Sequence, residues 1–403
     1  MKEGWEYKRL KDVATFTRGL TYSKNDEAEI SNNIVLRSNN VDLSTGKLNF
    51  DELKYLKPEF SIPEEKKVKK GSLLMCMSNG SKIHLGKVAL INKDYPYAFG
   101  GFMALVTPNE ELTPQFFHYS LSSPNYKDFI KKLSAGANIN NIKVKELELF
   151  TIPVPPLSEQ QSIVDYLDSA FAKIDAMKAN AEKALNEAKA LFQTSLKEML
   201  EPKDGWEVAT IGELGDIFGR IGFRGYTKSD LVAGPDEGAI TLSPSNIQDG
   251  RMDYTSCTYI SWFKYVESPE IMINNGDVLI VKTGSSYGKS AFVENLPHKA
   301  TINPQSVVIK NIKINNKFFA YLIRTPWVKA KFDEFVSGAA IPTFSQAKLS
   351  KVELFYPSND MQIDICRKLD SLKFKVDRLQ ANFDKISKEC DALKQAILRQ
   401  VFE

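Results

Sequence analysis

Polar and basic side chains gather in three short stretches of the first half of the chain, and a similar stretch follows each of them in the second half. Every stretch lies after, or between, runs of residues that favour β-strands, so a rigid element could present it. Hydroxyl and amide groups of this kind hydrogen-bond the edges of bases, and lysine and arginine bind phosphate oxygens. The stretches are therefore candidates for contact with nucleic acid.

We define three groups by their residues. Group 1 contains Arg18, Tyr22 and Lys24, with Arg220, Arg224 and Tyr226 as counterparts. Group 2 contains Arg37, Ser38, Asn39 and Asn40, with Ser243, Ser245 and Asn246 as counterparts. Group 3 contains Ser78, Asn79, Ser81, Lys82 and Lys87, with Lys282, Thr283, Ser285, Ser286, Tyr287 and Lys289 as counterparts. Asn138, Asn140 and Asn141 join this predicted surface, and the second half has Ile341-Pro342-Thr343 in their place. A single Ser-Asn-Gly loop is equally typical of a solvated turn, and it is the repetition that favours a shared role.

Motifs that resemble catalytic ones are incomplete. Residues 282–290 resemble a phosphate-binding loop, but three residues separate Gly284 from Gly288 where nucleotide-binding loops have four. Residues 154–157 share only two prolines with a methyltransferase motif of the form Asx-Pro-Pro-aromatic. The three histidines are scattered along the chain, which argues against a metal site. We therefore expect a binding protein that is not an enzyme and holds no cofactor or metal of its own.

Composition indicates a globular protein of two or more domains. The chain has 403 residues, 43% hydrophobic and 26% charged, and its net charge is only +3, so positive charge for a nucleic acid must be local. Four cysteines without a Cys-x-x-Cys pair favour a reducing compartment over zinc or disulfides. No run of 18 apolar residues and no signal peptide are visible, so we expect a cytoplasmic location.

The chain repeats itself. Gly4-Trp5-Glu6 returns as Gly205-Trp206-Glu207, and Phe116-Phe117-His118-Tyr119 returns as Phe318-Phe319-Ala320-Tyr321. The period is about 201 to 203 residues, half of the chain. Two units of this size indicate a tandem duplication rather than a solenoid.

Each half begins with about 155 residues that favour a mixed α+β domain and ends with a long helix. Pro153, Pro155 and Pro156 end the first globular part, and no proline or glycine follows before Leu200. We expect an α+β fold with a pseudo-two-fold tandem repeat: two similar globular domains, residues 1–157 and 202–357, separated by two long antiparallel coiled-coil helices, residues 158–201 and 358–403.

Both predicted helices carry apolar residues at alternating steps of four and three, which is the pattern of a coiled-coil seam. Small residues in one seam face large residues in the other if the helices are antiparallel, with Ala170 near Cys390. Packing of each helix on its own globular domain is the alternative. The predicted seam contains Ile163, Leu167, Ile174, Met177 and Leu191 in the first helix, and Ile365, Leu369, Val376, Leu379, Phe383, Ile386 and Leu393 in the second.

The junction Pro155-Pro156-Leu157-Ser158-Glu159-Gln160-Gln161, which leads into a long helix, resembles the junction in specificity subunits of type I restriction–modification systems. The start of each half, with Trp5-Glu6 and Trp206-Glu207, resembles the same family, and the likeness covers the whole chain. The second junction, residues 356–362, departs from the pattern because it keeps one proline and one glutamine.

The resemblance implies that each globular unit is a target recognition domain for one half of a split double-stranded DNA site. It implies that the helices set the gap between half-sites and bind two adenine-N6 methyltransferase subunits, which restriction and translocase subunits join. S-adenosylmethionine, ATP and magnesium would then belong to the partner subunits alone. A scaffold protein that uses its coiled coil to bind proteins, and no DNA, is the alternative.

Overall fold

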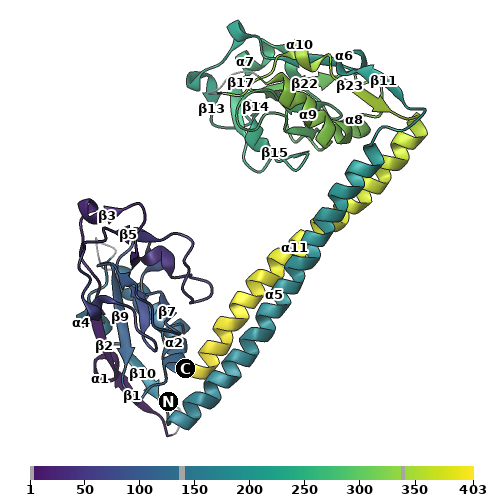
Figure 1. Ribbon diagram of the computed structural model, residues 1–403. Coiled ribbons are helices and arrows are strands. Elements are labelled where there is room, and N and C mark those ends of the chain that lie inside the picture. Colours follow the sequence, from purple (N-terminus) through teal and green to yellow (C-terminus); the bar gives the residue numbers. More distant parts are fainter. Residues whose placement is uncertain (1–3, 136–140, 337–340) are drawn as a thin grey trace. The chain divides into compact units, whose positions relative to one another are not determined.

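The structure, a computed structural model, describes residues 4–135, 141–336 and 341–403. The chain divides into two compact units: Met1–Glu182 with Phe383–Glu403, and Lys183–Asn382. Each unit contains one α+β globular domain and parts of both long helices, α5 (Leu157–Leu200) and α11 (Asn359–Phe402) (Figure 1). The expected α+β class with two long helices is confirmed.

The domain of unit 1 contains two four-stranded sheets. The first has the order β2-β9-β6-β7, and all its pairs are antiparallel. The second has the order β3-β5-β4-β8, in which β4 and β8 are parallel. A separate pair, β1 with β10, joins the beginning of the domain to its end. The bounds are β1 Glu6–Arg9, β2 Ala14–Arg18, β3 Glu27–Ala28, β4 Asn33–Leu36, β5 Lys54–Leu56, β6 Leu73–Cys76, β7 Val88–Leu90, β8 Ala98–Phe99, β9 Met103–Pro108, β10 Thr151–Val154, α1 Leu10–Val13, α2 Pro114–Ser120, α3 Pro124–Ala135 and α4 Val144–Leu147.

The domain of unit 2 repeats this topology with additions. The order β12-β22-β19-β20 corresponds to the first sheet of unit 1, and β13-β17-β14-β21 corresponds to the second. Strands β15 and β16 extend one sheet and β18 extends the other. The bounds are β11 Glu207–Thr210, β12 Asp216–Gly219, β13 Leu231–Val232, β14 Gly238–Leu242, β15 Ile247–Gln248, β16 Arg251–Met252, β17 Thr258–Ser261, β18 Met272–Ile273, β19 Val278–Val281, β20 Ser290–Phe292, β21 Ala300–Ile302, β22 Ser306–Lys310, β23 Glu353–Tyr356, α6 Ile211–Leu214, α7 Trp262–Val266, α8 Asn316–Ile323, α9 Pro326–Phe335 and α10 Gln346–Leu349.

The central strand of each domain lies between two hydrophobic cores. Leu73 and Met75 of β6 belong to the core that contains α2 and α3, whereas Leu74 and Cys76 face the second sheet. Strand β19 divides its residues between two cores in the same way. Successive side chains of a strand point to opposite faces, so an uninterrupted apolar run fits a strand that is covered on both sides.

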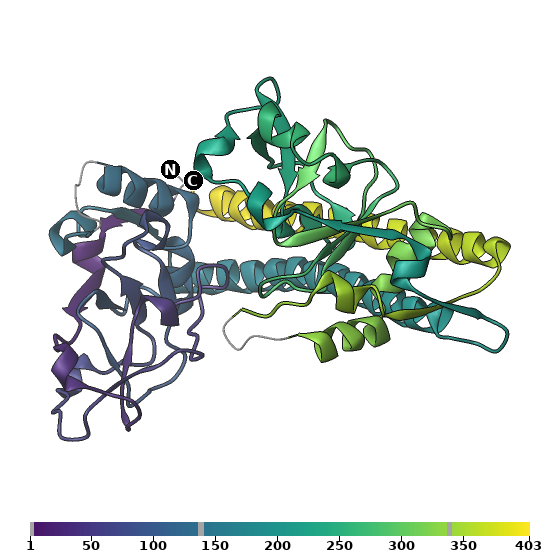
Figure 2. The same cartoon turned by 90° about the horizontal axis from the view of Figure 1, so that it is seen from above.

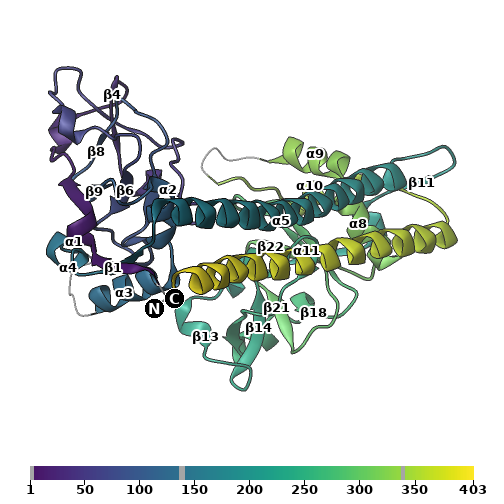
Figure 3. The same ribbon diagram turned by 90° about the horizontal axis from the view of Figure 1, so that it is seen from below.

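The long helices are continuous coils that run antiparallel to each other (Figures 2 and 3). In unit 1, Lys394 Nζ lies 2.6 Å from Asp175 Oδ1, and the Cys390 thiol lies 3.7 Å from the carbonyl oxygen of Ile174. In unit 2, Lys189 Nζ donates to Gln380 Oε1 at 2.8 Å. Cys390 is therefore paired four residues further along α5 than the expected Ala170.

The seam of α5 differs from the predicted one. Met177 and Leu191 are 60% and 56% exposed, whereas the buried residues are Leu185 and Phe192. In α11, Leu393 is 47% exposed, so the seam prediction is wrong at these three positions. The other predicted seam residues are buried or half-buried: Ile163, Leu167, Ile174, Ile365, Leu369, Val376, Leu379, Phe383 and Ile386.

The departure has a physical cause, because α5 contacts its partner helix and a globular core at the same time. Leu167 of α5 and Leu398 of α11 both belong to the core of unit 1. Leu196 of α5 and Leu369 of α11 likewise belong to the core of unit 2. The two packing alternatives, helix on helix and helix on domain, therefore occur together.

One buried glutamine in each half ties the long helix to its domain. Gln160 accepts from the backbone N–H of Thr113 at 2.8 Å and donates to the carbonyl oxygens of Glu111 and Pro155 at 2.7 and 2.9 Å. Gln362 accepts from the N–H of Asn315 at 2.9 Å and donates to a proline carbonyl at 2.7 Å. Together with one proline, these glutamines are what both junction sequences retain.

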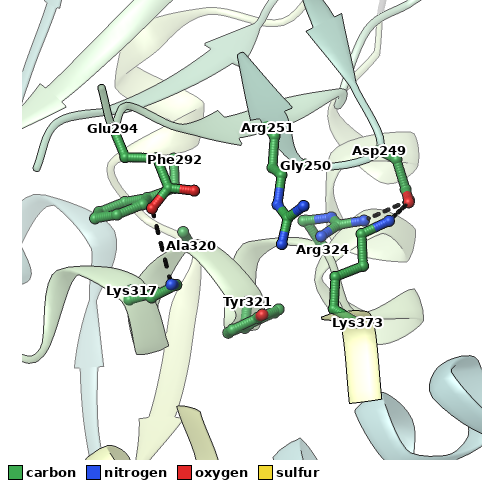
Figure 4. A pocket seen from close by; sticks show the side chains of 10 residues that line it. All are labelled: Asp249, Gly250, Arg251, Phe292, Glu294, Lys317, Ala320, Tyr321, Arg324 and Lys373. Atoms are coloured by element: carbon green, nitrogen blue, oxygen red, sulfur yellow. Dashed lines mark hydrogen bonds and ion pairs between the residues drawn. The ribbon is translucent and has the colours of Figure 1, made fainter. Parts of the chain in front are cut away.

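Charged side chains that pair with one another line a pocket in unit 2 (Figure 4). Arg324 and Lys373 both contact the carboxylate of Asp249, and Lys317 Nζ lies 3.8 Å from Glu294 Oε2. Because Lys373 belongs to α11, these pairs hold the turn after β15 against the helix. In unit 1 the corresponding turn packs on His118, and a Cβ on Gly46 would lie 2.6 Å from its Nε2.

Candidate nucleic-acid interface

In unit 1 the three predicted groups follow the ends of β2, β4 and β6, and the structure brings them together. Asn79 Nδ2 of group 3 donates to Ser38 Oγ of group 2 at 2.9 Å. The connection between β8 and β9 lies between the groups, because Gly100 N–H donates to the carbonyl of Leu36 at 2.9 Å. We call residues 18–24, 37–40, 78–82 and 100–102 the loop surface of unit 1.

Close packing of two backbones explains Gly19, which follows Arg18 of group 1. A Cβ on Gly19 would lie 2.0 Å from the carbonyl oxygen of Gly100, which no side chain tolerates. The N–H of Gly19 donates to the carbonyl of Met103 at 3.1 Å. The glycine therefore serves the contact between two loops, and its N–H is not available to a phosphate.

The corresponding groups of unit 2 meet in the same way. Arg220 follows β12 and donates through Nη2 to Thr301 Oγ1 at 3.2 Å. The N–H of Asn303 donates to the carbonyl of Leu242, the last residue of β14, at 2.9 Å. Lys282, just after β19, donates its N–H to the carbonyl of Gln305 at 2.8 Å. We call residues 220–228, 243–246, 282–289 and 303–305 the loop surface of unit 2.

Asn40 and Asn246 shape these surfaces from inside. They are 0% and 4% exposed, and each Oδ1 accepts the backbone N–H three residues earlier, at 2.8 and 3.0 Å. Each Nδ2 donates to two backbone carbonyls of the following loop. The expected base contact does not hold for these two residues, because their amides are used inside the loop. Asn39 is exposed and contacts Glu52 at 3.3 Å.

Group 1 differs between the two units. Arg18 and Lys24 are exposed, whereas Arg220 is 6% exposed and its guanidinium lies 5.2 Å from the centre of the Tyr226 ring. Burial lowers the pKa of Arg220. Arg224 forms an ion pair with Glu270 at 3.5 Å, and the Tyr226 hydroxyl contacts Thr241 at 3.1 Å. In unit 2 these residues therefore support the loop.

In group 3, the loop that resembles a phosphate-binding loop uses its backbone within the protein. The N–H of Thr283 donates to Gln305, that of Gly284 to Pro342 at 2.9 Å, and that of Gly288 to Val281 at 2.8 Å. These N–H groups cannot surround a phosphate, which is what such a loop requires. The segment is a turn between β19 and β20.

Several other predicted side chains have partners of their own. Lys87 Nζ donates to the carbonyl of Val41 at 2.8 Å, and burial lowers its pKa. Burial also raises the pKa of Tyr22, which is half-buried beside the charge of Arg37. Further contacts join Ser243 to Ser245 at 2.7 Å, Tyr287 to Asp333 at 2.9 Å and the Ser81 N–H to Asn79 at 2.9 Å. The exposed members of group 3 are Ser81, Lys82, Ser285 and Lys289, and Ser286 and Lys282 are half-buried.

The fourth predicted stretch borders the loop surface where it is described. Asn141 pairs with Ser78 through an isolated β-bridge, and Thr343 pairs with Thr283 in the same way. The hydroxyls of Thr283 and Thr343 also lie 2.8 Å apart. Asn138 and Asn140 lie outside the described residues.

Sequence analysis missed the residues at the centre of each loop surface. Phe102 is 72% exposed in unit 1, and its carbonyl accepts from the N–H groups of Met77 and Ser78 at 2.9 and 3.2 Å. Gln305 is exposed in unit 2, and its carbonyl accepts from Lys282 and Thr283 at 2.8 and 3.2 Å. The sequence feature that could have identified Phe102 is an aromatic residue directly after two glycines, Gly100 and Gly101.

Comparisons with known proteins agree with this architecture. Residues 2–187 match the family model described as type I restriction modification DNA specificity domain. The chain is 25% identical to the type I restriction enzyme EcoKI specificity subunit of Escherichia coli (strain K12), covering 100% of this chain and 89% of that protein. These matches make the chain similar to the specificity subunits of type I restriction–modification systems. The chain is also 24% identical to the StySPI specificity subunit of Salmonella potsdam, with the same coverage of 100% and 89%.

Solved structures show the same fold. A chain of a type I restriction–modification assembly matches with a TM-score of 0.74 at 18% identity, over 99% of this chain and 98% of that chain. The HsdS subunit from Thermoanaerobacter tengcongensis matches with a TM-score of 0.55 at 17% identity, over 100% and 97%. Within residues 4–135, 141–336 and 341–403, no helix combines the length and apolarity needed to cross a membrane.

Proposed function

We propose that this chain is a specificity subunit of a type I restriction–modification system and reads a split double-stranded DNA sequence, one half-site with each globular domain. The observation that carries the proposal is the repeated loop surface, which gathers the same three groups around the same strand connection in both units. Two domains of one fold but different surface residues suit two half-sites of different sequence. Exposed cations such as Lys24, Lys82 and Lys289 bind phosphate oxygens and supply the salt-dependent part of the affinity.

The subunit itself catalyses no reaction under this proposal. It directs two adenine-N6 methyltransferase subunits, joined by restriction and translocase subunits, to the sequence that it has bound. S-adenosylmethionine, ATP and magnesium are needed only by those partners, and the complex works in the cytoplasm, where the DNA is. The paired helices α5 and α11 set the gap between the half-sites and carry exposed residues for the methyltransferases.

The test is co-expression with the adenine methyltransferase subunit encoded beside this chain, followed by mapping of methylated adenines with and without the chain. We expect a two-part motif that depends on this subunit, and DNA binding that weakens steeply as salt increases. Co-purification without any dependent motif would instead identify a scaffold protein.

A further inference from the structure

The strand connection at the centre of each loop surface presents one side chain whose chemistry differs between the units. In unit 1 the connection from β8 to β9 ends with Phe102, and in unit 2 the connection from β21 to β22 ends with Gln305. Each lies just before the strand that pairs with the central strand of its domain. They are therefore equivalent positions in a repeated frame.

The backbone of both residues is held in the same way. The first N–H group after each connection closes a turn. In unit 1 the N–H of Met103 donates to the carbonyl of Gly100 at 2.8 Å, and in unit 2 the N–H of Ser306 donates to the carbonyl of Asn303 at 3.2 Å. The carbonyls of Phe102 and Gln305 each accept two N–H groups from the group 3 loop. A fixed backbone with an exposed side chain is what precise contact with a ligand requires.

The exposed ring of Phe102 has no structural cause in its own domain. An aromatic side chain that is 72% exposed contributes little to folding, and the backbone carbonyl of Phe102 is bonded to the N–H of Ser78 in the polar group 3 loop. An apolar ring in such a surface matches the one apolar feature of the major groove, the methyl group of thymine.

Gln305 offers the complementary chemistry. Its Oε1 accepts from Nδ2 of Asn303 at 3.0 Å, and Asn303 is only 8% exposed, so a buried amide orients an exposed one. The glutamine Nε2 can then donate to N7 of adenine while Oε1 uses its second lone pair to accept from the adenine amino group.

We propose that Phe102 and Gln305 are specificity-determining residues at equivalent positions of the two half-sites, Phe102 selecting thymine and Gln305 selecting adenine. The proposal rests on the function proposed above and assigns one base of each half-site to one side chain. A matched contact of this kind discriminates between bases by about 5- to 150-fold.

The experiment uses the complex of this chain with its methyltransferase subunit and a duplex DNA library randomised over the wild-type motif. Variants F102A, F102Q, Q305A and Q305F are each selected on the library. F102Q is expected to change the preference at one position of one half-site from thymine to adenine, and Q305F is expected to make the reverse change in the other half-site. The alanine variants should lose preference at the same single positions.

F263A is the matched control. Phe263 is 73% exposed, close to the value for Phe102, but it follows Ser261, which pairs with Gly238 at the end of β14 opposite to group 2. Its motif should equal that of the wild type. If a variant keeps the wild-type preference at the half-site that the substituted residue does not contact, the variant has folded.

The outcomes separate the two proposals. If the wild-type complex selects no split motif, the proposed function itself is wrong, and the base assignment falls with it. If the wild type selects a motif and F102A and Q305A leave every position unchanged, only the base assignment is overturned. Loss of both half-sites in F102Q, or loss of methyltransferase binding with an unchanged motif, would overturn it as well.

Discussion

At the scale of single residues, adjacent asparagines in one loop have opposite roles. Asn40 is completely buried and saturates its amide on backbone groups, while Asn39 beside it is exposed. The sequence predicts the group, because polar residues follow a strand. It cannot assign the roles within the group, because burial depends on how residues 41–52 fold back over the loop.

Replacing Asn40 by alanine should destabilise unit 1 by about 1 to 3 kcal/mol, because a buried N–H and two carbonyls lose their partner. N39A should change stability by less than about 0.5 kcal/mol and reduce binding of one half-site only. Urea unfolding of both variants gives the comparison. Equal stability of the two would contradict the assigned roles.

A second residue-scale prediction concerns pH. Burial lowers the pKa of His118 to about 4, whereas an unfolded histidine titrates near about 6.5. The unfolded chain therefore binds a proton that the folded domain excludes. The stability that neutral His118 contributes should be fully present above about pH 6.5. It should be lost as pH falls towards 4, by about 3 kcal/mol at the lower end.

The variant H118A introduces the residue that the second half has at this place, Ala320. Thermal unfolding between pH 7 and 4 should show a weaker pH dependence for H118A than for the wild type. Parallel curves for the two proteins would mean that another group causes the acid sensitivity.

At the scale of elements, the helix junction explains a sequence motif. Of the residues that resemble the family junction, only a proline and Gln362 remain in the second half, and this glutamine makes two of the three contacts of Gln160, one to a backbone N–H and one to a proline carbonyl. The departure noted in the sequence therefore leaves the structural contact intact.

Removing a junction glutamine should loosen the long helix from its domain. Q160A leaves the Thr113 N–H and two carbonyls without their partner, so a loss of about 1 to 3 kcal/mol is expected, together with faster hydrogen exchange at Thr113. The neighbouring Gln161 is exposed and contacts only Asp165 among the described hydrogen bonds, which makes Q161A the control. Unchanged exchange at Thr113 in Q160A would refute the assigned contact.

The seam of α5 shows where sequence reasoning reaches its limit. Seam positions 167, 174, 181, 188 and 195 give steps of four and three either with Ala170, Met177, Ala184 and Leu191 or with the next residues, Phe171, Lys178, Leu185 and Phe192. Leu191 is exposed and Phe192 is buried because Phe192 packs in the globular core that the helix also contacts. The spacing of apolar residues along the helix contains no information about that core.

The corrected seam gives a direct test. L185A removes a side chain that is 3% exposed and should cost about 2 to 5 kcal/mol, whereas L191A, at 56% exposed, should cost less than about 1 kcal/mol. Urea unfolding measures both. A larger effect of L191A would restore the predicted register.

At the scale of the whole molecule, the repeat has copied a frame rather than a surface. The order of strands is the same in both domains, and so are the junction glutamines and the Tyr–Asp contacts Tyr119–Asp168 and Tyr321–Asp370. The period of the sequence predicted that the two halves share a fold, but not these contacts. Chemistry at equivalent positions, such as His118 against Ala320, has diverged.

Deleting one matched heptad from α5 and from α11 should shorten the spacer by about 10 Å, or about three base pairs. Methylation mapping should then return the same half-sites with a shorter gap. A motif with the wild-type gap would contradict the spacer role.

The loops at the strand ends are joined mainly through backbone atoms, because the carbonyls of Phe102 and Gln305 accept the N–H groups that hold the connection in place. Such bonds are indifferent to the side chain that each residue carries. A point mutation there leaves the fold intact and alters what is recognised, so a lineage can acquire new specificities through single steps that each yield a stable protein.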